Sequence, residues 1–183
     1  MAMAAAPVRG RAVTLLLLGA AVAVGLGVYG NVHDPTGRSL VTLFFTATIN
    51  LKVWFATGAF LLAGFQGWSA LRMYGKIGKG VPHAWLGRAH RASGSLAFLL
   101  TIPVAYHCLW ALGFQAGRVR VLVHSLAGCL FFGALAAKVL VVRSSGLPDW
   151  ALPLIGGTVF TALVVVWLTS ALWFFTTVEF PGF

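Results

Sequence analysis

Long runs of apolar residues, separated by short polar connections, make up most of the chain. Roughly 20 mainly apolar residues cross a bilayer as a helix, and five runs reach that length. Backbone polar groups cannot stay unsatisfied in lipid, so each run is predicted to be helical. The predicted fold is therefore all-α: a polytopic membrane protein with a single integral membrane domain, residues 1–183, whose five transmembrane helices form a bundle. The helices are expected at approximately 12–32, 41–73, 90–114, 119–143 and 150–178.

The composition agrees with this prediction. Hydrophobic residues make up 60% of the chain and charged residues 9%, whereas soluble domains average about 45–50% and about 25%. These values exclude a water-soluble enzyme. The net charge is +10, from 13 basic and 3 acidic residues. The basic residues stand at the ends of apolar runs rather than on one basic face, so the expected partner is the lipid bilayer and not a nucleic acid.

The basic residues also predict an orientation. Eight of them fall on the side of the membrane that holds the N-terminus: Arg9, Arg11, Arg72, Lys76, Lys79, Arg88, Arg91 and Arg143. Three fall on the other side: Arg38, Arg118 and Arg120. The positive-inside rule therefore predicts a multi-pass protein of the cell membrane, with a cytoplasmic N-terminus and an extracytoplasmic C-terminus.

Two histidines lie well inside apolar runs, where ionisable residues are rare and usually face the interior. His107 lies six residues before Gly113, where the third helix leaves the membrane, and His124 lies six residues after Arg118, where the fourth enters. Both are thus expected roughly 9 Å below the same outer surface. A tight outer turn makes these helices antiparallel neighbours, so the two imidazoles could be the axial ligands of a haem iron. Alternatively, His107 and His124 are hydrogen-bond partners that join the helices.

Small and basic residues near this pair fit the same chemistry. Gly128 lies four residues after His124, on the same helical face, and would leave room for a porphyrin edge. Arg118 and Arg120, at the outer mouth, could pair with haem propionates. Lys52 is expected near the same depth, where an unpaired charge costs a few kcal/mol. Its partner would be a propionate, a quinone oxygen or a backbone carbonyl, unless the side chain reaches to the interface.

The inner side of the membrane offers a second set of candidates. His90 opens the third helix, His83 lies in the preceding loop, and Lys138 is near the inner end of the fourth run. Together they could hold a second haem or a quinone, with His90 handling protons. Lys138 could equally extend to the interface. At the outer end of the first helix, His33 is either solvated or a reserve ligand that pairs with His107, if the first and third helices face each other across the bundle.

The segment at residues 83–94 (HAWLGRAHRASG), then Tyr106-His107, then residues 124–128 (HSLAG), resembles bacterial b-type cytochromes. The similarity covers residues 83–143 and is closest to the cytochrome b561 and ferric-reductase-like membrane group. There, His-Arg-x-x-Gly and His-x-x-x-Gly elements open helices that hold haem. The resemblance implies bis-histidine haem b, with His107 and His124 as ligands and His90 as a candidate, and one-electron transfer, often with quinone.

This sequence also departs from that group. The group often places four histidines as two clear pairs, commonly on helices that face each other across a bundle. Here one pair is clear and sits on consecutive helices, so a transmembrane path through two haems is in question. The His…Gly…Lys pattern of the fourth helix is also similar to an uncharacterised bacterial family of small membrane proteins.

The leading interpretation is a membrane b-type cytochrome subunit, with one haem b, or two if the inner site also holds one. It would exchange electrons with a quinol or an extracytoplasmic redox partner, as an electron-transfer subunit of an oxidoreductase or as a homo-oligomer. The alternative is a haem-free scaffold or accessory subunit of a larger complex, or a small transporter. Secondary transporters often show inverted repeats, and none is visible here, so the scaffold is the stronger alternative.

Overall fold

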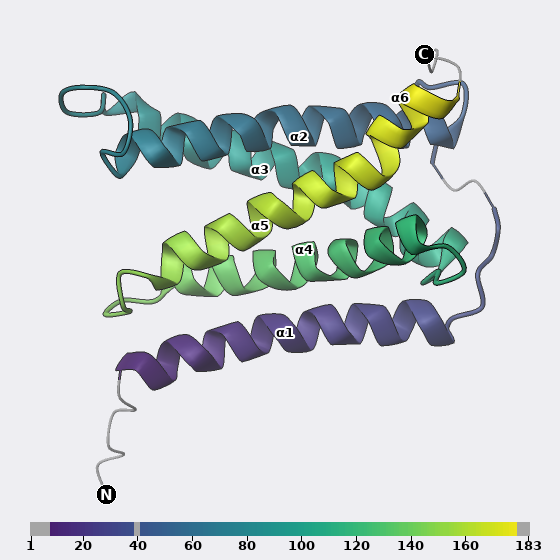
Figure 1. Ribbon diagram of the computed structural model, residues 1–183, viewed down its shortest axis with the longest axis horizontal. Coiled ribbons are helices and arrows are strands. Elements are labelled where there is room, and N and C mark those ends of the chain that lie inside the picture. The colour runs from purple at the N-terminus through teal and green to yellow at the C-terminus, as the bar shows by residue number, and fades with distance from the viewer. Residues whose placement is uncertain (1–7, 39–40, 179–183) are drawn as a thin grey trace, which may run out of the picture. The chain divides into compact units, whose positions relative to one another are not determined.

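The protein is a succession of membrane-length helices (Figure 1). The computed structural model describes residues 8–38 and 41–178, and no β-strand occurs in these ranges. Five helical segments are long and apolar enough to cross a membrane, which confirms the predicted all-α polytopic fold. The helices are α1 (Val8–Val32), α2 (Thr48–Met73), α3 (Trp85–His107), η1 (Cys108–Leu112), α4 (Val119–Arg143), α5 (Ala151–Trp167), η2 (Leu168–Leu172) and α6 (Trp173–Thr177).

The second span starts later than the apolar pattern predicts. α2 begins at Thr48, although the apolar run begins near residue 41. Leu43 has a φ of 50°, in the left-handed region that a right-handed helix cannot include. Lys52 is therefore only one turn from the start of α2, roughly 6 Å along the axis, rather than deep within a longer helix.

The chain divides into two compact units. The first unit contains residues 1–33 and 114–166, and so holds α1, α4 and α5. The second unit contains residues 34–113 and 167–183, with α2, α3, η1, η2 and α6. The fifth span is thus shared, because its last part, from Trp167 onward, belongs to the second unit.

In the first unit, α1 and α4 pack side by side through small residues (Figure 1). A Cβ built on Gly19 would lie 2.6 Å from both the carbonyl oxygen of Gly133 and the Cβ of Ala137. A Cβ on Gly133 would collide with the carbonyl oxygen of Gly19 and lie 2.7 Å from the Cβ of Ala23. Small residues let membrane helices approach this closely, and the gain is van der Waals contact. From this contact toward the C-terminal end of α4, a buried cluster adds α5: Ala12, Ala134, Ala137, Val141, Ala151 and Ile155.

In the second unit, α2 packs along α3 (Figure 1) and also receives the end of the fifth span. Val53 and Ala56 of α2 form a buried cluster with Ala171 of η2. The indole of Trp167 stacks on Phe60, with ring centroids 4.3 Å apart. Its Nε1–H donates a hydrogen bond of 3.1 Å to the hydroxyl of Thr57. Aromatic stacking and one polar bond thus fix the end of the fifth span to α2.

There are two short π-helical segments in the described residues, and both belong to the second unit: η1 ends the third span, and η2 lies between α5 and α6. The segment η1 follows His107 directly. Its carbonyls at Trp110 and Ala111 accept hydrogen bonds from the backbone N–H groups of Thr36 and Gly37, at 3.3 and 3.0 Å. The connection between α1 and α2 is therefore tied to the end of the third span.

Candidate functional site

His107 is a buried histidine with an unsatisfied ring nitrogen. It is the last residue of α3, immediately before η1, and its side chain is 9% exposed. Its Nδ1 has no hydrogen-bond partner within the described part of the chain. A buried polar atom without a partner costs about 1–3 kcal/mol. A ligand or a water molecule that bonds to Nδ1 would remove this cost.

Two polar residues of α2 accompany His107 in the second unit. The ammonium group of Lys52 is close enough to act electrostatically on the His107 ring. Thr48 lies one turn before Lys52 on the same face of α2, is 5% exposed, and has a hydroxyl oxygen without a partner in the described residues. The sequence pattern did not single out Thr48, because its buried position is evident only once the true start of α2 is known.

His124 is half-buried in the second turn of α4. It belongs to the first unit and His107 to the second, so their pairing stays a prediction from the sequence. Gly128 has open space beside it, since a Cβ built there would meet nothing within 4 Å. Lys138, also half-buried, lies within roughly 40° of the face that carries His124. Within the first unit, α1 contacts α4 at Gly133, and Ala134 belongs to the buried cluster that α4 shares with α5.

The remaining outer candidates lie near helix ends. Arg118 immediately precedes α4 and is exposed, whereas Arg120 is half-buried in its first turn. His33 follows α1 and stacks on Tyr29, with ring centroids 5.1 Å apart and an interplanar angle of 9°. This stacking gives His33 a structural contact of its own, in the first unit.

The inner candidate His90 takes part in a hydrogen-bond network between α2 and α3. Its Nδ1 lies 2.7 Å from the hydroxyl of Ser69, a residue with no exposed surface. The side-chain amide of Gln66 donates one hydrogen bond to the backbone carbonyl of His90 and a second, of 2.7 Å, to the hydroxyl of Ser93. The sequence pattern missed Gln66 and Ser69, because single polar residues in an apolar run give no sign of their partner helix.

The hydroxyl of Ser69 lies within hydrogen-bond distance of two groups: the His90 ring, at 2.7 Å, and the carbonyl of Gln66 on its own helix, at 3.1 Å. The amide oxygen of Gln66 also lies 3.0 Å from where a Cβ would stand on Gly94, so the space beside Gly94 is already filled. These bonds give His90 a role in joining α2 to α3, whereas His83 is exposed in the loop.

Removing the Ser69 hydroxyl and the His90 ring should have coupled effects on stability. We expect Ser69→Ala and His90→Ala each to lower the free energy of unfolding. The double variant should lose less than the sum, with a coupling energy of about 0.6–1.7 kcal/mol, as for other hydrogen bonds between membrane helices. Denaturant titration of the detergent-solubilised variants measures this coupling. A coupling of zero would show that the two side chains do not interact.

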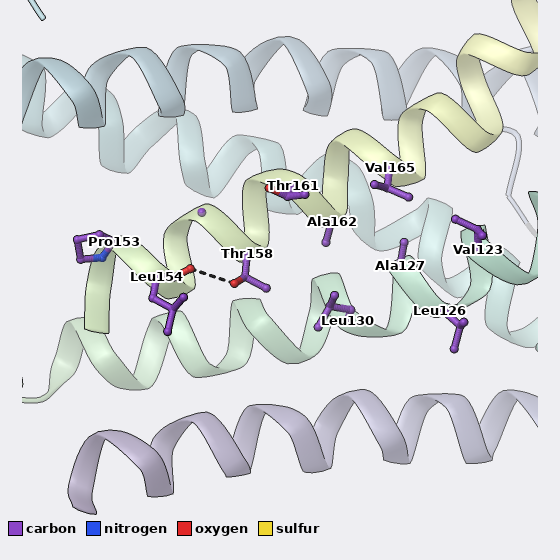
Figure 2. Close-up of a pocket in the computed structure, with 11 residues that line it drawn as sticks. Val123, Leu126, Ala127, Leu130, Pro153, Leu154, Thr158, Thr161, Ala162 and Val165 are labelled. Atoms are coloured by element: carbon purple, nitrogen blue, oxygen red, sulfur yellow. Dashed lines mark hydrogen bonds between the residues drawn. The ribbon is translucent and has the colours of Figure 1, made fainter. Parts of the chain in front are cut away.

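A groove of about 670 Å³ runs between α4 and α5 in the first unit (Figure 2). Eleven residues line it: Val123, Leu126, Ala127, Leu130, Pro153, Leu154, Gly157, Thr158, Thr161, Ala162 and Val165. The hydroxyl of Thr158 donates to the carbonyl of Leu154 at 3.0 Å and so offers no donor to the groove. No histidine is among the lining residues, so the groove is apolar and is not the predicted haem site.

The metal-ligand chemistry of the described residues is limited. No group of three or more His, Cys, Asp or Glu side chains that could hold a metal ion occurs in residues 8–38 and 41–178. A site made by protein ligands alone is therefore not found there. A bis-histidine haem site needs only two protein ligands, because the porphyrin supplies the others.

The fold and these side chains define a polytopic helical membrane protein with polar groups buried within its helix pairs. A family of unknown function, DUF6529, matches residues 12–182, and the chain belongs to this family. No curated protein and no solved structure matches the chain.

Proposed function

We propose that this protein is a membrane b-type cytochrome subunit that transfers single electrons through a bis-histidine haem. The observation that supports this most is the buried ring of His107, whose Nδ1 has no partner in the described residues. A buried ring nitrogen without a hydrogen-bond partner lowers the stability of the fold. Binding of the ring to a haem iron would offset that cost.

The second axial ligand in this proposal is His124, chosen from the sequence by its matching depth on the consecutive helix. Gly128, with open space beside it, would accept the porphyrin edge. Bound haem would supply the one-electron redox change. The protein would supply ligation, burial and charge. Lys52, which acts electrostatically on His107, would neutralise the negative charge of one haem propionate. Arg118 and Arg120 are the candidates to neutralise the other.

The redox partner in this proposal is a quinol or an extracytoplasmic electron carrier, reached from the outer end of the third and fourth spans. The basic residues predict that this end is extracytoplasmic, in the cell membrane. The connections between spans are short, so a partner subunit or a second copy of the chain would complete the pathway. His90, His83 and Lys138 are the candidates for a second haem or a quinone at the inner end.

A haem-free scaffold subunit is the second candidate function. The observation in its favour is His90, which already acts as a hydrogen-bond partner between α2 and α3. The same kind of role for His107 would need a partner for Nδ1, and the described residues provide none. We therefore favour the cytochrome.

A dithionite-reduced minus oxidised absorption spectrum tests the proposal. Detergent-purified protein from cells supplied with haem is expected to show a sharp b-type band, with about one haem per chain. A content near two per chain would add His90 to the ligands and support electron transfer across the membrane. Colourless protein would contradict the cytochrome and leave the scaffold.

A further inference from the structure

The connection between α2 and α3 is a glycine-rich loop that one arginine holds in shape. The guanidinium of Arg72 donates hydrogen bonds to the carbonyl oxygens of Lys79 and Gly80, at 2.7 and 3.0 Å. Gly75, Gly78 and Gly80 have positive φ values of 67°, 74° and 76°, which other residues rarely adopt. A Cβ on Gly78 would lie 2.9 Å from Nε of Arg72. The loop is therefore folded closely around the guanidinium.

This loop and its two helix ends carry a concentrated positive charge. Between residues 72 and 91 there are five Lys and Arg residues and no Asp or Glu. Four of them are exposed: Lys76, Lys79, Arg88 and Arg91. The fifth, Arg72, adds its positive charge to the cluster, because the backbone carbonyls that it binds are neutral and do not compensate it. Nothing in this stretch compensates the field of these groups.

Apolar and aromatic side chains project from the same loop. Val81 is 90% exposed, and Tyr74 and Trp85, at the two ends of the connection, are each 50% exposed. In membrane proteins Tyr and Trp concentrate at the boundary between lipid and water. An exposed valine beside exposed lysines suits the zone between lipid headgroups and acyl chains. The composition of the loop is thus typical of a segment at the level of the headgroups.

We propose that the clamped loop together with its two helix ends, residues 72–91, is a binding site for the phosphate groups of anionic phospholipids. Clusters of four to eight basic residues next to a membrane helix attract anionic headgroups. Arg72 holds the loop, so the cationic side chains start from fixed backbone positions. Val81, Tyr74 and Trp85 favour a lipid over the acidic surface of a soluble protein. The positive-inside rule alone would account for basic residues here but not for an ordered loop. The site does not depend on whether the protein binds haem.

Native mass spectrometry of the full-length protein in detergent tests this site. We expect phosphatidylglycerol to remain bound at lower concentration than phosphatidylcholine, and inorganic phosphate to bind far more weakly. The double variant Lys76→Gln, Lys79→Gln should weaken phosphatidylglycerol binding roughly 30-fold, from the typical contribution of two basic residues. The matched control Arg9→Gln, Arg11→Gln removes the same charge from exposed positions outside the loop and should change binding less than threefold.

A second variant separates the clamp from the charge. Arg72→Lys keeps the positive charge. Its single ammonium nitrogen cannot hold both carbonyls as the two guanidinium nitrogens do, so this variant should weaken phosphatidylglycerol binding several-fold. Equal losses in the loop variant and the Arg9, Arg11 control would overturn the proposal, because net charge alone would then explain binding. Equal affinity for phosphatidylcholine, or for free phosphate, would overturn the assignment to anionic lipid. Displacement of phosphatidylglycerol by polyglutamate at matched charge would instead indicate an acidic protein partner.

Discussion

Replacing His107 by alanine is expected to abolish the b-type absorption band. In a bis-histidine site each imidazole is an iron ligand, and the His107 ring is buried at the end of α3, where water cannot readily replace it. The haem content of the purified variant should fall to near zero. Absorption spectra and extracted haem per chain, compared with wild type at equal protein concentration, measure this loss.

The control for this experiment is His83→Ala, which removes an exposed histidine from a loop and should leave the outer haem in place. His107→Leu, assayed in haem-free protein, measures what the buried nitrogen costs. The variant should gain about 1–3 kcal/mol of unfolding free energy, because Nδ1 has no partner in the described residues. Pigment that survives in His107→Ala would rule out this residue as a ligand, and colourless wild type from cells supplied with haem would favour the scaffold.

Gly133→Ala is expected to disrupt the contact between α1 and α4. The new Cβ would meet the backbone carbonyl of Gly19 and lie 2.9 Å from the backbone nitrogen of Ala23. Backbone atoms cannot move aside as a flexible side chain can, so the helices must separate. Overpacking of this kind costs about 1–3 kcal/mol, and lipid readily replaces the lost contacts. Denaturant titration in detergent should show this loss of unfolding free energy.

The matched control is Gly25→Ala on α1, where the new Cβ would meet nothing within 4 Å. That substitution gains helix propensity of up to about 1 kcal/mol. The two Gly→Ala changes should therefore have opposite signs. Equal effects at both positions would mean that α1 and α4 do not approach each other at Gly133.

The number and class of the helices were predictable from the sequence, because the need to satisfy backbone groups in lipid leaves few alternatives. The bounds of α4, Val119–Arg143, coincide with the prediction, since Arg118 and Arg143 mark its ends. The start of α2 was not predictable from hydropathy, because residues 41–47 are about as apolar as the helix. Only the left-handed backbone at Leu43 reveals the break.

Individual candidates at the site were easier to predict than their neighbours. His107 stood out because histidine is rare within apolar runs, and the structure indeed buries it. Thr48 and Ser69 did not stand out, because Thr and Ser are common in membrane helices. Gln66 did not, because a single polar residue in an apolar run gives no sign of its partner helix. Their importance depends on which residue of another helix lies opposite, and a single sequence does not contain that information.

The π segment η2 has a consequence for how the fifth span must be understood. A π turn accommodates one more residue than an α turn, and each residue of an α-helix advances the face by about 100°. The residues before Leu168 and those after Leu172 are thus out of phase by about one residue. The change of unit falls at Trp167, directly before this slip. The fifth span therefore has two helical registers, one before η2 and one after it. Deleting one residue from η2 would rotate the face of α6 by roughly 100° while leaving the other side chains unchanged.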